Sequence, residues 1–137
     1  MLYDLENLFS DNQAVTADAA STNVIKLTNG PLKEVAFGTP IPLRIQVTET
    51  FATLTSLEIK VQTATDATFT TPVTLATTGA VAAADLVAGY VAPINFIPKG
   101  NLGFMRIYYD VTGSNATAGK ITAGIVAGNS GSWEDMA

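Results

Sequence analysis

The stretch FMRIYYDV, residues 104–111, alternates between two kinds of side chain along its whole length. Its odd-numbered positions are apolar or aromatic, and its even-numbered positions include Arg106 and Asp110. A period of two is that of a β-strand with one face on a core. Because Tyr108 and Tyr109 fall on opposite faces, we expect at least one of these rings to be buried. The other ring, on a strand rich in aromatic residues, is a candidate for binding sugars or proteins.

Other segments have the same character. Residues 41–49 and 57–63 alternate with the same period, and in 57–63 the charged residues fall on the face opposite the apolar one. Weaker strand signals cover residues 23–27, 73–77, 87–97 and 120–127. Pro93 has no N–H to donate to a sheet, so residues 87–97 are predicted to be an edge strand, a bulge or a bend.

About seven strands are therefore predicted, separated by turn-forming Gly, Pro and Asn residues. The one helical candidate, residues 82–87, is too short to contribute to the architecture. This pattern predicts an all-β fold, an antiparallel sandwich, and does not by itself separate a jelly roll from an immunoglobulin-like topology.

The composition excludes much chemistry. The chain has 137 residues, twelve acidic and seven basic, for a net charge of −5, and it contains no histidine and no cysteine. Its length predicts one domain. The missing residue types remove disulfides, thiolate metal sites and the commonest general base. The seven basic residues are too few and too scattered along the sequence to bind the phosphate backbone of a nucleic acid. We therefore expect no catalytic residues, no cofactor, no metal and no nucleic-acid partner.

Only 14% of the residues are charged, and twenty alanines and nineteen threonines supply much of the rest. Two interpretations remain open: a neutral Thr/Ala-rich β-domain, or a domain whose surface is partly covered by other subunits, since interface cores are poor in charge. No run of residues is apolar enough to predict a membrane span, and the opening MLYDLENLFS lacks the features of a secretory signal.

The two ends differ from the middle. Residues 1–22 are interpreted as an N-terminal arm, residues 23–127 as the β-sandwich domain, and residues 128–137 as a flexible or partner-bound tail. Large apolar residues near the N-terminus indicate that this segment is held in place, either by the same domain, which we favour, or by a neighbouring subunit. For the tail the two alternatives are even.

Several segments together resemble one family. They are LFSDNQAVT at 8–16, AASTNVI at 19–25, LRIQVTETF at 43–51, LVAGY at 86–90, RIYYDV at 106–111 and TAGKITAGI at 117–125. In order and spacing they resemble the capsid cement, or decoration, proteins of tailed phages, of the type found in the Bordetella phage. The resemblance spans roughly residues 8–127.

This resemblance implies a jelly roll rather than an immunoglobulin-like sandwich. It also implies a protein of the virion, made in the cytoplasm of the bacterial host, that binds the outer surface of the capsid and clamps neighbouring subunits. Its partners would be the major capsid protein and a second or third copy of itself, as a dimer or trimer. No catalytic residue and no cofactor is implied.

We further hypothesise which residues touch a partner. The large apolar side chains at the two ends are the candidates: Tyr3, Leu5, Leu8, Phe9 and Trp133. Two other functions stay open, a carbohydrate-binding or adhesion module of a phage tail and, more remotely, a small hydrolase.

Overall fold

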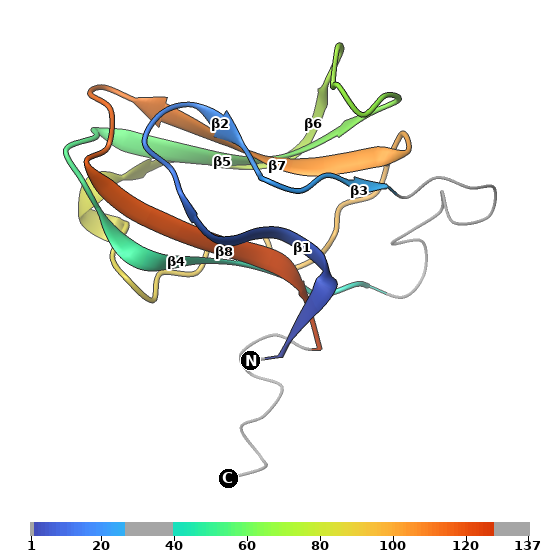
Figure 1. The fold of residues 1–137 in the computed structure, drawn as a ribbon, viewed down its shortest axis with the longest axis horizontal. Coiled ribbons are helices and arrows are strands. Elements are labelled where there is room, and N and C mark those ends of the chain that lie inside the picture. The colour runs from blue at the N-terminus through green and yellow to red at the C-terminus, as the bar shows by residue number, and fades with distance from the viewer. Residues whose placement is uncertain (1, 27–39, 128–137) are drawn as a thin grey trace, which may run out of the picture.

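A computed structural model describes residues 2–26 and 40–127, which form two antiparallel sheets packed as a sandwich (Figure 1). One sheet has the order β1-β8-β4; the other has the order β2-β7-β5-β6, with β3 also paired to β7. The predicted all-β sandwich is confirmed. The strands are β1 (Tyr3–Ala14), β2 (Ala19–Ala20), β3 (Ile25–Lys26), β4 (Leu43–Ala52), β5 (Ser56–Ala64), β6 (Val73–Ala82), β7 (Phe104–Thr112) and β8 (Ala118–Val126).

The core lies between the two layers and follows the alternation of the strands. On β7, Met105, Ile107 and Tyr109 are fully buried, whereas their even-numbered neighbours face outward. β5 pairs with β7 in unbroken register and presents its own buried set to the same core. Burying each such aliphatic side chain stabilises the fold by about 1.5–3 kcal/mol. The expectation that one tyrosine of the pair is a core residue is confirmed, and that residue is Tyr109.

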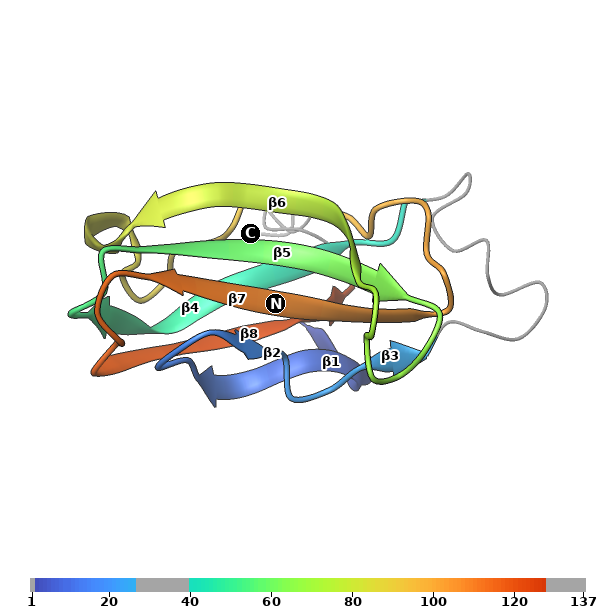
Figure 2. The ribbon, with the colours of Figure 1, turned by 90° about the horizontal axis from the view of Figure 1, so that it is seen from above.

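The segment predicted from residues 87–97 does not form a regular strand. It runs along the free edge of β4, held there by isolated bridges from Val91 and Phe96 (Figure 2). The backbone N–H of Val47 donates to Tyr90, and that of Ala92 donates to Ile45, each at 2.9 Å. This agrees with the prediction of an edge segment. The helical candidate before it contains a single 3₁₀ turn, η2 (Ala83–Asp85).

The N-terminal segment enters the sandwich. Residues 3–14, part of the arm predicted for residues 1–22, form β1, and β1 pairs along β8 as the outer strand of the three-stranded sheet. Phe9 and Val15 are each 1% exposed within the core. The apolar side chains of Leu8, Phe9 and Val15 are therefore explained by burial against the same domain, whereas Leu2 and Leu5 stay exposed.

A set of hydrogen bonds through Ser10 and Gln13, which we call the polar seam, connects β1 to the opposite layer. The hydroxyl of Ser10 lies 2.8 Å from that of Tyr109, and it donates to the side-chain oxygen of Gln13 at 2.7 Å. The amide of Gln13 in turn donates to the carbonyl of Ala20, on β2, at 2.9 Å. Ser10 and Tyr109 are both fully buried, and burial raises the pKa of the tyrosine hydroxyl. These bonds satisfy polar groups that would be costly to bury alone.

Candidate partner-contact surfaces

The first surface is the start of β1. In the pairing with β8, Tyr3 lies opposite Val126 and Leu8 opposite Gly124, so residues 4–7 bulge out of the sheet. The carboxylate of Asp4 accepts bonds from the backbone N–H of Glu6 at 3.0 Å and from the side chain of Asn7 at 2.6 Å. The bond from Asn7 is the main reason that the pKa of Asp4 is lowered. The bulge is thus an ordered acidic turn.

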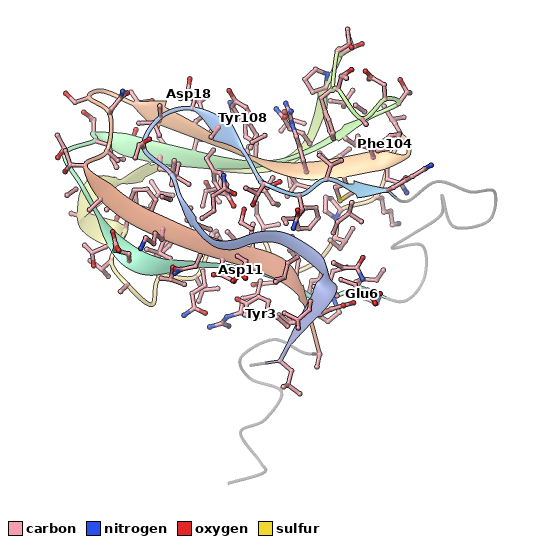
Figure 3. The ribbon with its side chains drawn as sticks, viewed as in Figure 1. Tyr3, Glu6, Asp11, Asp18, Phe104 and Tyr108 are labelled. Atoms are coloured by element: carbon pink, nitrogen blue, oxygen red, sulfur yellow. The ribbon has the colours of Figure 1, made fainter. Side chains whose placement is uncertain are left out.

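The residues predicted to contact a partner separate into different groups. Leu5 stands at the bulge and is 80% exposed, as a contact residue requires. Leu8 and Phe9 are buried within the chain itself, at 6% and 1% exposure. Tyr3 is half-buried near the start of β1 (Figure 3), and burial raises the pKa of its hydroxyl. Trp133 lies outside the described residues.

The second surface is the outer side of the five-stranded sheet, which we call the β5–β7 face. It consists of outward side chains that lie opposite one another in register, namely Glu58 and Asp110, Lys60 and Tyr108, and Gln62 and Arg106. Tyr108 and Phe104 lie along this upper layer, on the side away from Tyr3 and Glu6 (Figure 3).

At one end of the β5–β7 face a single cation, Lys60, lies between two carboxylates. The ammonium of Lys60 lies 2.8 Å from the carboxylate of Asp110 and 3.7 Å from that of Glu58. The bond to Asp110 is the first cause of a raised pKa for Lys60. These side chains are partly exposed, so the ion pairs are screened by water and contribute little to stability.

The other end is built around Arg106. The Nε of Arg106 donates to the side-chain oxygen of Gln62 at 2.9 Å. Its guanidinium carbon lies 4.2 Å from the centre of the Phe69 ring and 5.3 Å from that of Tyr108. A guanidinium stacked on aromatic faces is held in one plane. Burial lowers the pKa of Arg106, although the group remains a cation at any ordinary pH.

Phe69 is a residue that the sequence pattern did not single out. It belongs to the β5–β6 connection, residues 65–72, which rises above the upper layer (Figure 1). Phe69 is 5% exposed and has the unusual backbone angle φ +52. The carboxylate of Asp66 accepts bonds from the hydroxyls of Thr68 and Thr70, which fix the turn and lower the pKa of Asp66.

A comparison with known protein families identifies the chain's relatives. The model of the Bbp16 family matches residues 9–125. The chain belongs to the Bbp16 family. This is a Bordetella phage protein family, so the phage part of the predicted resemblance is confirmed. None of the curated proteins compared with the chain matches it.

Metal sites, pockets and membrane-spanning helices are absent from the described part of this Bbp16-family chain. Within residues 2–26 and 40–127, no group of His, Cys, Asp and Glu side chains is placed to hold a metal ion. No pocket is present over the same described part of the chain. No helix there is long and apolar enough to cross a membrane. The described features that stand out are therefore the exposed bulge at Leu5 and the β5–β7 face.

Proposed function

We propose that this phage protein is a capsid cement, or decoration, protein. It binds the outer surface of a tailed-phage head and clamps neighbouring major capsid subunits against the pressure of the packaged DNA. It acts structurally and not as an enzyme. The observation that carries the proposal is the match to the Bbp16 family over nearly the whole sandwich, residues 9–125.

The physical character of the chain suits this role. A ligand that binds only the assembled lattice stabilises that lattice by mass action. Many copies on repeated sites add up to a large effect even where each contact is modest. Small uncharged Thr and Ala side chains suit a surface that neighbouring subunits cover.

The strand order supports a jelly roll for the proposed cement protein. With residues 87–97 taken as the fourth strand of the smaller sheet, the layers read β1-β8-β4-(87–97) and β2/β3-β7-β5-β6. This order is the one expected for a jelly roll, an eight-stranded sandwich of two Greek keys, and it supports that topology for the proposed protein. Self-association as a dimer or trimer fits a clamp that sits on a symmetry axis of the shell.

The proposal is tested on phage heads that lack the protein. Such heads should lose their DNA at a lower temperature than decorated heads, and adding the purified protein should restore their heat resistance. The Leu5→Ser variant, changed at the most exposed apolar side chain of the bulge, should restore it less well at equal concentration. The net charge of −5 favours a basic patch on the shell, so binding should weaken as salt rises to physiological strength.

A protein that leaves the heat resistance of such heads unchanged is not a cement protein. Binding to glycans without affinity for heads would instead identify a carbohydrate-binding or adhesion module of a phage tail.

A further inference from the structure

Arg106 differs from the other cation of its face in having no ion-pair partner among the residues that the structure describes. The chain has an excess of acidic residues, and Lys60 on the same face is paired with two of them. Among residues 2–26 and 40–127, however, no carboxylate lies within ion-pair distance of Arg106. Its hydrogen-bond partner is the neutral oxygen of Gln62, which uses only the Nε–H. No described residue forms an ion pair with Arg106 or accepts a hydrogen bond from its Nη groups.

The site around this cation is also held in a strained conformation. A bulky residue such as Phe69 rarely takes a positive φ, and such strain is concentrated at functional sites. Here the strained turn places the Phe69 ring against the guanidinium of Arg106, and the ring of Tyr108, on β7, contacts the same guanidinium. Gln62 fixes its rotation about the stacking axis. The result is a guanidinium whose orientation is set before any partner arrives.

We propose that Arg106, held by Phe69, Tyr108 and Gln62, is a binding site for a carboxylate side chain of the shell's major capsid protein. A planar guanidinium binds a carboxylate through two parallel hydrogen bonds, and fixing it beforehand reduces the entropy lost on binding. This inference rests on the proposed function and names the part of the β5–β7 face that would make the contact.

The kind of partner follows from the chemistry of the face. Arg106 stands on the outer face of a sheet, and flat protein interfaces concentrate their binding energy in Arg and aromatic anchors of this kind. A nucleic acid would require a series of cations, whereas this face carries Arg106 beside a Lys60 that is already paired. An acidic side chain on a protein is the ligand that matches one oriented guanidinium.

The test measures binding of the full-length protein to heads that lack it. Arg106→Lys keeps the positive charge and removes the planar fork. We expect it to bind at least about tenfold more weakly, the loss that accompanies a charge-assisted hydrogen bond. Arg44→Lys is the matched control, because the Nε of Arg44 also donates to a glutamine, Gln46, at 3.1 Å, but on the other sheet. It should bind within about twofold of the unchanged protein.

A second arm tests the carboxylate itself. Heads whose surface carboxylates have been converted to amides with a carbodiimide should bind the unchanged protein and Arg106→Lys equally. An advantage of the unchanged protein that survives amidation would show that the ligand is not a carboxylate. Thermal unfolding of each variant verifies that it is folded. A variant that is not folded is replaced by two others: Phe69→Leu, which removes an aromatic ring from the guanidinium, and Tyr108→Phe, which keeps the ring at position 108.

The outcomes separate the two proposals. If Arg106→Lys and, where used, Phe69→Leu bind like the unchanged protein, or if Arg44→Lys weakens binding as much as Arg106→Lys, the Arg106 site is refuted while the cement function stands. If the unchanged protein does not bind heads at all, the proposed function fails and this site fails with it.

Discussion

The bond between Ser10 and Tyr109 gives a quantitative test of the way β1 is built into the sandwich. The one hydroxyl proton of Ser10 is donated to Gln13, so the hydroxyl of Tyr109 donates to Ser10 across 2.8 Å. Both residues are 0% exposed, so water cannot replace a lost partner. The perturbations are Ser10→Ala, Tyr109→Phe and the double variant.

The expected magnitudes follow from which groups each change leaves unpaired. Ser10→Ala leaves the Tyr109 hydroxyl buried without an acceptor, at a cost of about 1–3 kcal/mol. Tyr109→Phe removes the donor while Ser10 keeps its bond to Gln13, at a cost of about 0.5–1.5 kcal/mol. The double variant contains no orphaned tyrosine hydroxyl, so it should lose less than the sum of the two single losses, by about 1 kcal/mol.

The assay is urea unfolding followed by circular dichroism, with thermal unfolding as a second measurement. For a chain of this length, each 1 kcal/mol corresponds to a shift in Tm of about 3–4 °C. Ser114→Ala, at an exposed serine of the turn between β7 and β8, is the control and should stay within about 0.5 kcal/mol of the unchanged protein. The proposed bond between Tyr109 and Ser10 would be refuted if Ser10→Ala lowered the free energy of unfolding by as little as the control. It would also be refuted if the two single losses added strictly in the double variant.

Two further predictions concern stability. A Cβ on Gly119, which has φ +138, would overlap the Phe51 ring, so Gly119→Ala should cost about 3 kcal/mol or more. Gly89→Ala, at φ +97 in open space, should cost only about 1–2 kcal/mol, and equal losses in thermal unfolding would contradict this packing. The N–H of Gly119 lowers the pKa of Glu49, and the hydroxyls of two threonines lower that of Asp66. These two carboxylates therefore stabilise the folded protein fully at any pH above their ordinary pKa values of 4.5 and 3.8. That stabilisation is lost as the pH falls through their lower pKa values in the folded state. The free energy of unfolding, measured from pH 6 to pH 2, should fall less steeply in the Glu49→Gln, Asp66→Asn variant, and an unchanged slope would refute the assignment.

The sequence was sufficient for features that depend on local periodicity. The alternation in residues 104–111 identified the buried face of β7 because each side chain's direction follows from its position in a strand. Pro93 likewise limited residues 87–97 to an edge strand, a bulge or a bend, and those residues lie along the edge of β4 with isolated bridges.

Features set by long-range contacts were not predictable in the same way. Leu8 and Phe9 looked like contact residues of an arm because the sequence does not show that β1 pairs with β8, more than a hundred positions away along the chain. Leu5 is exposed, unlike Leu8 and Phe9, because the bulge at residues 4–7 interrupts the alternation of inward and outward side chains along β1. Phe69 and Gln62 meet Arg106 from a different strand and connection, and no spacing rule links them to it.

The most direct measurement of the central claim compares assembled and unassembled capsid protein. The purified protein is mixed either with mature heads that lack it or with unassembled major capsid subunits, and each mixture is separated by sedimentation. A cement protein that recognises the lattice should sediment with the heads, saturate at a fixed number of copies per head, and stay free of the subunits. Absence from the heads, or equal binding to the isolated subunits, would contradict the account.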